Sequence, residues 1–220
     1  MMSIRAVLFD LDGVLIDSMP HHIRAWQQVL SEIGIQVDSL YIRLHEGEKA
    51  EATIGRLLHE HGMEMSKDDL EQLIDKKRTL YRKTAPKGLI PGARYTVEKL
   101  KAAGIICAIV TGSVRANMTS VLSDDDIALF DPVITAEMYT HGKPHPEPYL
   151  TAIKALKLPA SDCLVVENAP RGIQSAKAVG IKVVALTVTL PKKYLSEADV
   201  ICDRHDELLN IVGVKTKQNT

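Results

Sequence analysis

The 220-residue chain has only three cysteines, and their placement does not indicate a metal site or a disulfide framework. Cys107, Cys163 and Cys202 lie far apart in the sequence, each in or beside an apolar run. Zinc sites and small disulfide-bonded domains need cysteines at close or paired spacings, so the sequence favours neither class. We expect three reduced side chains in the core.

Long apolar runs and a surplus of one charge are also missing. No stretch of about 20 apolar residues is present, which is the length that a membrane-spanning helix requires. Arg5 and Asp10 make the N-terminal segment unlike a signal peptide. Lysine and arginine total 27, aspartate and glutamate total 28, and the net charge is −1. We therefore expect a cytoplasmic protein without affinity for nucleic acid or membranes, and a monomer or weak dimer.

The spacing of apolar residues changes along the chain. Residues 4–10 predict a buried strand, whereas residues from about 17 to 88 show only helical spacing. The insert contains predicted helices at 21–34, 50–61 and 66–84, the last with Ser66 and Asp69 in capping-box positions. Beyond residue 91, predicted helices (92–103, 114–122, 146–156, 171–179) alternate with predicted strands (105–110, 132–135, 163–166, 182–186, 199–202). This alternation predicts an α/β fold with a parallel sheet covered on both faces.

The segment Asp10-Leu11-Asp12-Gly13 directly follows the first predicted strand. In open α/β sheets, ligands bind just beyond the carboxyl ends of the strands. Two carboxylates spaced by two residues can divide the chemistry there: one attacks and holds a metal, and the other moves a proton. The same residues could also form a simple turn.

Thr111-Gly112-Ser113 follows the predicted strand at 105–110. A hydroxyl together with exposed backbone N–H groups at a helix start binds phosphate oxygens. We expect Thr111 to be the better phosphate ligand and Ser113 to serve mainly as the N-cap of the next helix.

Lys143 lies in a proline-braced Gly-Lys-Pro turn. An ammonium held in such a turn can neutralise a nucleophilic carboxylate and a phosphate together, although a lysine before a helix is ordinarily a surface residue. We expect the neighbouring His145 to be structural or exposed, because we find no metal-ligand spacing around it.

Glu167 and Asn168 end the strand predicted at 163–166 and offer the hard oxygen ligands that suit Mg²⁺. Asn168 could instead be an N-cap. A chance arrangement is improbable, because four strand ends or adjoining turns each carry residues suited to phosphate or metal binding.

These four segments, in this order, resemble the motifs of the haloacid dehalogenase superfamily of phosphohydrolases. The resemblance implies a Rossmann-like doubly wound core (residues 1–16 and 89–220) and a small helical-bundle cap inserted after the first strand (residues 17–88). The insert is similar to the cap of the β-phosphoglucomutase-like branch. Stretches at 17–20, 45–47, 142–149 and 167–170, with Trp26, are most similar to the inorganic-pyrophosphatase-like members of this branch.

The resemblance implies a role for each motif residue. Asp10 is similar to the nucleophile that becomes an aspartyl phosphate, and Asp12 to the general acid, whose backbone carbonyl also holds Mg²⁺. The remaining implied residues are phosphoryl ligands, a charge-neutralising lysine and further metal ligands: Thr111 and Gly112, Lys143, and Glu167 with Asn168. Ser113 is a further candidate substrate ligand.

The resemblance predicts a Mg²⁺-dependent phosphohydrolase that acts on a small phosphorylated metabolite, either pyrophosphate or a sugar or polyol phosphate. Asp12 argues against a dehalogenase, because a departing halide needs no acid. A β-phosphoglucomutase-type phosphomutase is the alternative enzyme. A phosphoacceptor signalling domain is the non-enzymatic alternative, although such domains need neither a second aspartate two residues on nor a helical insert.

The segment around Glu46 and Lys49 falls where the branch carries its substrate loop, although a solvated helix start explains these charges equally well. Lys49 is a point charge and not the arginine that grips a distal phosphate in the mutases, which weakens the mutase alternative. We expect exposed or structural roles for His21 and His22. Asn168 stands where many members have aspartate, and we expect the lower negative charge to favour a diphosphate substrate.

Overall fold

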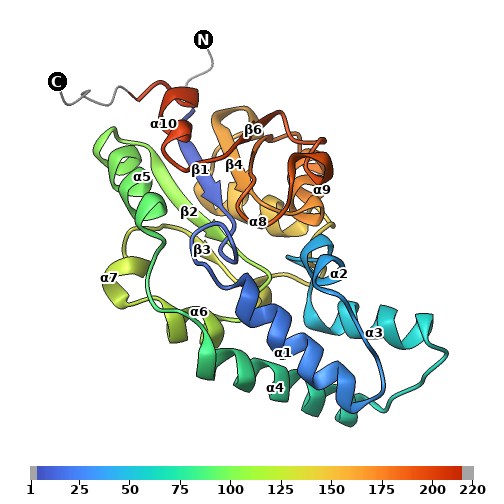
Figure 1. Ribbon diagram of the computed structural model, residues 1–220. Coiled ribbons are helices and arrows are strands. Elements are labelled where there is room, and N and C mark those ends of the chain that lie inside the picture. Colours follow the sequence, from blue (N-terminus) through green and yellow to red (C-terminus); the bar gives the residue numbers. More distant parts are fainter. Residues whose placement is uncertain (1–3, 215–220) are drawn as a thin grey trace.

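The structure is a computed structural model that describes residues 4–214. Within these residues, six parallel strands form one sheet in the order β3-β2-β1-β4-β5-β6 (Figure 1). The strands are β1 (Ala6–Phe9), β2 (Ile106–Val110), β3 (Val133–Ile134), β4 (Cys163–Glu167), β5 (Lys182–Leu186) and β6 (Val200–Cys202). The predicted α/β class with a Rossmann-like parallel sheet is confirmed.

Both faces of the sheet are buried, which explains why its strands are almost continuously apolar. Val7 and Phe9 of β1 pack on one face against helices α5 (Pro91–Ala102), α6 (Arg115–Val121) and α10 (Glu207–Ile211). Ala6 and Leu8 pack on the other face against α8 (Glu147–Leu156) and α9 (Pro170–Ala178). The remaining elements of this part are the short helix α7 (Asp124–Ile127) and the 3-10 turns η1 (Ala136–Met138), η2 (Ala160–Asp162) and η3 (Lys192–Tyr194).

The register of the central strand brings the sequence motifs to one edge of the sheet. Phe9 is paired with Ile109 of β2 on one side and with Val166 of β4 on the other. The residues that follow, Asp10 and Glu167, therefore emerge side by side at the carboxyl edge, with Thr111 two positions beyond Ile109. The ladder hydrogen bonds thus position three of the four motifs.

The helices between β1 and α5 pack around an apolar cluster of their own. They are α1 (Met19–Glu32), α2 (Ser39–Leu44), α3 (Ala50–Glu60) and α4 (Lys67–Thr84), and they extend away from the sheet beyond its carboxyl edge (Figure 1). Trp26, Ile54 and Ile74 belong to this separate cluster. The N-cap predicted for the third long helix is present, because Ser66 accepts a hydrogen bond from the Asp69 backbone N–H. These observations support our proposal that residues 17–88 form a cap.

The cysteine prediction is also supported, because Cys107, Cys163 and Cys202 are buried and unpaired. Among the helices described for residues 4–214, none has the length and apolar character needed to cross a membrane.

We predict that the cap cluster contributes substantially to stability. Ile54 is fully buried, so Ile54→Ala should lower the free energy of unfolding by about 2–5 kcal/mol through lost burial and a residual cavity. Leu150→Ala, at a helix position that is 45% exposed, serves as the matched control and should change it by less than about 0.5 kcal/mol. Chemical denaturation measures both, and equal effects would contradict the packing described for the insert.

Candidate active site at the carboxyl edge of the sheet

Lys143 joins the motifs that the sequence places far apart. Its Nζ lies 2.6 Å from Asp10 Oδ1 and 2.6 Å from Glu167 Oε1, and it also donates to the Val110 carbonyl at 3.1 Å. The side chain is fully buried. The surface alternative for this lysine is therefore excluded, and the loop before α8 contributes directly to the site.

Burial would lower the pKa of Lys143, but the adjacent carboxylates of Asp10 and Glu167 outweigh it and hold that pKa well above its usual value. The lysine is therefore a permanent positive charge. Asp10 behaves differently, because burial raises its pKa to about 7 even though Lys143 opposes this shift. The nearby charges of Glu167 and Asp12 add to this rise.

Hydrogen bonds to both oxygens hold the Glu167 carboxylate in place. Its Oε1 accepts hydrogen bonds from Lys143 and from the Tyr149 hydroxyl, the latter at 2.7 Å, and its Oε2 accepts the Asn168 backbone N–H at 3.2 Å. A Cβ atom at Gly172 of α9 would overlap the Glu167 carboxylate, so only glycine fits there. The start of α9 is therefore packed directly against the site.

Two buried acceptors suit a bound cation. Among the residues that the structure describes, Asp10 Oδ2 and Asn168 Oδ1 are buried without a hydrogen-bond partner. The amide nitrogen of Asn168 donates to the Asp12 backbone carbonyl at 3.1 Å, which leaves that carbonyl a second lone pair. Unpartnered buried oxygens are costly, and oxygen donors are the ligands that Mg²⁺ prefers. These residues therefore fit a hard divalent cation.

The second aspartate accepts hydrogen bonds from both the core and the insert. Asp12 Oδ1 accepts from Ser18 Oγ at 2.6 Å and is 2.9 Å from His22 Nε2, while its Oδ2 accepts from Ser113 Oγ at 2.8 Å. Lys77 of α4 extends this network, with its Nζ 2.9 Å from His22 Nδ1. A lysine that donates to Nδ1 places the ring hydrogen on Nε2, facing Asp12.

The protonation states of this network follow from burial and from neighbouring charges. Burial, and then the charge of Lys77, lower the pKa of His22. Burial lowers the pKa of Lys77 to about 8. Burial would raise the pKa of Asp12, but the adjacent His22 and the hydrogen bonds from His22, Ser18 and Ser113 outweigh it and hold that pKa below its ordinary value.

The structure corrects the sequence-based expectation for Ser113 and decides between the alternatives for His22 and Asn168. Ser113 is not the N-cap of α6, which begins after Val114 without a side-chain cap, because the Ser113 hydroxyl donates to Asp12. His22 is structural, as expected, but it is buried and contacts a candidate catalytic carboxylate, whereas His21 is only partly buried. The N-cap alternative for Asn168 is excluded, because Ala169 holds that position in α9.

Sequence reasoning missed several residues that contact Asp12, its partner His22 or Glu167. They are Ser18, Lys77, Tyr81 and Tyr149. Lys77 and Tyr81 are four residues apart on α4, on the same face as the buried Leu73 and Ile74. A lysine within an apolar helical stripe was the available signal, since such a residue is rarely buried without a partner.

The loop before α3 closes over the site. A Cβ at Gly112 would approach the Gly47 carbonyl oxygen to 2.6 Å, and a Cβ at Gly47 would approach Lys143 Cδ to 2.7 Å, so the two backbones meet closely. Glu48 pairs with Arg171 of the core at 2.9 Å. The insert therefore rests against the sheet edge in this structure.

Glu46 and Lys49, the two candidate substrate ligands from the insert, differ in their surroundings. Lys49 Nζ donates to the Tyr139 backbone carbonyl at 2.6 Å, so its charge is engaged by the core. Glu46 is partly buried, and desolvation followed by the charges of Asp10 and Asp12 raises its pKa well above the usual value. Glu46 therefore faces the same electrostatic environment as the two aspartates.

A cavity of about 770 Å³ lies between the insert and the core. Asp12, Gly112 and Ser113 line it on the core side, and Glu46 and Gly47 on the loop side. Apolar and basic side chains of the insert complete its wall: Trp26, Leu30, Leu57, Lys77, Arg78 and Arg82. The cavity is large enough for a ligand considerably bigger than inorganic phosphate.

The family profile of haloacid dehalogenase-like hydrolases matches residues 7–186, a range that includes all four motifs. The chain belongs to this family. Relatives include the validoxylamine A 7′-phosphate phosphatase of Streptomyces hygroscopicus subsp. limoneus, which is 31% identical over 90% of this chain and 92% of its own length. Hexitol phosphatase A of Escherichia coli is 30% identical over 91% of each chain.

Structural comparison leads to the same family. A Bacteroides vulgatus protein described as a candidate β-phosphoglucomutase superposes with a TM-score of 0.86 at 29% identity, covering 98% of this chain and 92% of that one. The resemblance to the β-phosphoglucomutase-like branch is thereby confirmed. These relatives support a phosphohydrolase or phosphomutase role for this family member.

We predict that Gly172 is essential to the position of Glu167. Gly172→Ala should lower the free energy of unfolding by about 1–3 kcal/mol, because the added methyl group would force α9 away from the carboxylate. Gly55→Ala is the matched control: Gly55 is also helical but has open space around its Cβ position, so alanine should stabilise by about 0.5–1 kcal/mol. Denaturation curves measure both changes. A Gly172→Ala variant with an unchanged free energy of unfolding would contradict the described contact.

Proposed function

We propose that this protein is a Mg²⁺-dependent phosphohydrolase that acts on a small phosphorylated metabolite through an aspartyl phosphate on Asp10. The observation that carries this proposal is the pair of buried, unpartnered oxygens on Asp10 and Asn168 beside a fully buried Lys143. A structural ion pair alone would not leave such acceptors unpaired. A nucleophile and a cation ligand explain them.

In the proposed reaction, an Asp10 carboxylate oxygen attacks phosphorus while the bond to the leaving oxygen breaks. Lys143 neutralises charge between Asp10 and the phosphoryl group. Thr111 Oγ1 accepts the Ser113 N–H at 3.0 Å, so its own hydrogen is oriented to donate to a phosphoryl oxygen, together with the Gly112 N–H. Water then hydrolyses the aspartyl phosphate.

Asp12 is proposed to protonate the leaving oxygen and then to activate the water. Its low pKa suits the second task. For the first task Asp12 must take up a proton, and the negative charge of a bound phosphate would raise its pKa in that direction. Asn168, Asp10 and the Asp12 carbonyl would hold Mg²⁺, with Glu167 acting directly or through water. When bound, the cation neutralises negative charge on the phosphoryl group.

For the substrate, we favour a sugar or polyol phosphate. The cavity of about 770 Å³ combines apolar walls with hydrogen-bonding groups, and pyrophosphate would leave most of it unfilled. The two phosphatases reported above are named for a hexitol phosphate and for validoxylamine A 7′-phosphate. Pyrophosphate, suggested by the uncharged Asn168, remains the competing substrate prediction.

The similarity to the Bacteroides vulgatus protein favours the phosphomutase alternative. Against it, Lys49 is bound to the Tyr139 carbonyl and is not directed at a second phosphate. A phosphoacceptor signalling domain would leave the large cavity and the second aspartate without a role.

The decisive experiment measures phosphate release from a substrate panel at fixed Mg²⁺. We expect hexose or polyol phosphates to be hydrolysed faster than pyrophosphate and nucleotides. Asp10→Asn should reduce turnover at least about a thousandfold, because the amide is a poor nucleophile. Isomerisation of a hexose 1-phosphate without phosphate release would instead identify a mutase, and phosphorylation without turnover would identify a signalling domain.

We predict that Lys77 influences turnover through His22 and Asp12. The pKa of Lys77 is lowered to about 8, so its charge is present below that pH and is lost above it. We therefore expect kcat/KM to fall as the pH rises through about 8. In Lys77→Met, the maximum kcat/KM should be about tenfold lower, and this alkaline decrease should be absent. Lys76→Met is the matched control, because its side chain is 52% exposed and pairs with Glu32. An unchanged alkaline limb in Lys77→Met would contradict the proposed positioning role.

A further inference from the structure

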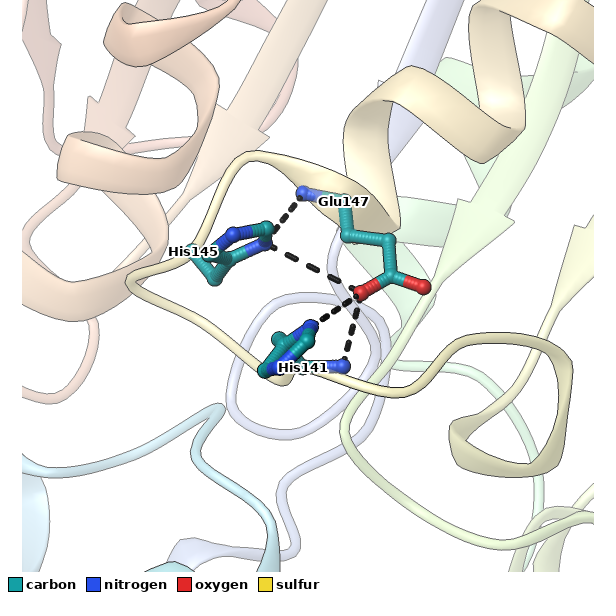
Figure 2. Close-up of side chains that lie close together, drawn as sticks. All are labelled: His141, His145 and Glu147. Carbon is teal, nitrogen blue, oxygen red and sulfur yellow. Dashed lines mark hydrogen bonds and ion pairs between the residues drawn. The ribbon is translucent and has the colours of Figure 1, made fainter.

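A second group of potential metal ligands lies on the loop that carries Lys143. His141 and His145 are two residues before and two residues after that lysine, and Glu147 is the first residue of α8. One ligating atom from each lies within 4.8 Å of the others. Figure 2 shows both imidazole rings directed at the Glu147 carboxylate.

The carboxylate is held in place before any cation binds. Its Oε1 accepts the Thr140 N–H and its Oε2 accepts the His141 N–H, both at 2.8 Å. These two backbone hydrogen bonds fix the orientation of the carboxylate. A fixed carboxylate is a preorganised ligand.

His145 presents a ring nitrogen toward the Glu147 carboxylate. Its Nδ1 accepts the Glu147 backbone N–H at 3.2 Å, so this nitrogen carries a lone pair and no hydrogen. The same Nδ1 faces Glu147 Oε2 across 3.9 Å (Figure 2). Two acceptors therefore face each other. A cation between them would take the Nδ1 lone pair in place of the long Glu147 N–H hydrogen bond, and would form a bond to each acceptor.

We propose that His141, His145 and Glu147 bind a transition-metal cation such as Zn²⁺ or Cu²⁺, separately from the Mg²⁺ site at Asp10. Zn²⁺ and Cu²⁺ bind imidazole nitrogens well, whereas Mg²⁺ prefers a set of oxygen ligands. Bonds of about 2.0–2.2 Å in a tetrahedron separate ligand atoms by roughly 3.4 Å. The distances from Oε2 to Nδ1 of His141 and His145, 2.9 and 3.9 Å, bracket this value. The His141 Nδ1 donates a hydrogen to Oε2, and the cation would displace that proton, which moves to Nε2 or to solvent.

The side chains can adjust to such a cation. His141 and His145 are 65% and 49% exposed, so small rotations meet little resistance and water can complete the coordination. The cation would join both ends of the five-residue segment around Lys143. We therefore expect binding to stabilise this loop in its active position, since a ligand that binds only the folded state stabilises it.

The sequence did not signal this site. We expected His145 to be exposed or structural, and its exposure is confirmed. The ligands become neighbours because the loop reverses at Lys143 and Pro144, so that His141 approaches the first turn of α8.

The test uses Cu²⁺ added at one equivalent to the full-length protein in excess Mg²⁺, with electron paramagnetic resonance as the readout. Hyperfine splitting from nitrogen ligands is expected, because the proposed Mg²⁺ ligands at Asp10 are all oxygens and the nearby Lys143 nitrogen is held as an ammonium group. In the double variant His141→Gln/His145→Gln this splitting should disappear, and titration should show Cu²⁺ binding at least about tenfold weaker.

The matched control is His59→Gln/His61→Gln, which removes two exposed histidines from the end of α3 and should leave the splitting unchanged. Circular dichroism verifies that both variants fold. Nitrogen splitting that persists in the folded His141→Gln/His145→Gln variant, or that is absent from the unsubstituted protein, overturns the proposal. Either outcome leaves the proposed phosphohydrolase function untouched, since neither histidine contacts Asp10, Asp12 or Lys143.

Discussion

The structure depends on the burial of one ammonium group between two carboxylates. Lys143 is inaccessible to water, and its Nζ is 2.6 Å from both Asp10 and Glu167. A buried charge without partners would cost several kcal/mol, so the loop before α8 stays at the sheet edge only while these contacts persist. Tyr149 and Gly172 complete the arrangement, because the first donates to Glu167 and the second leaves room for it. Helices α8 and α9 therefore serve both packing and the site.

A second polar network connects the insert to the core. Asp12 follows β1, but His22 and Lys77, which determine its hydrogen bonding and charge environment, come from α1 and α4. Any movement of these helices relative to the sheet would change the environment of Asp12. The contacts of Gly47 with Gly112, and of Glu48 with Arg171, hold the insert against the core in this structure. In the proposed reaction, opening of these contacts would admit substrate, and closure would restore the environment of Asp12.

Much of the fold could be predicted from local patterns. The strand at Lys182–Leu186 begins and ends at the predicted residues, and β4 and α3 differ from prediction by one residue, because their apolar runs end at charged residues or glycines. The short helices α2, α7 and α10 were missed, since four to six residues show too little periodicity. Lys143 was weighed as either a surface or a site residue, and burial decided the question. Ser113 was misassigned because a serine before a helix can be an N-cap or can donate to a distant carboxylate, and the sequence does not distinguish these roles.

The sequence by itself determined the alternation of strands and helices, the family, and the order of the four motifs, because each depends on neighbouring residues and on periods of two or 3.6 residues. Only the tertiary structure decided which charges meet. Contacts such as Lys77 with His22, or Lys143 with Glu167, join residues 55 and 24 positions apart. Such contacts depend on strand register and helix packing, and no local preference of the chain encodes them. The pKa values follow the same rule, since burial and distant charges decide whether Asp10, Asp12 and Lys77 carry a proton.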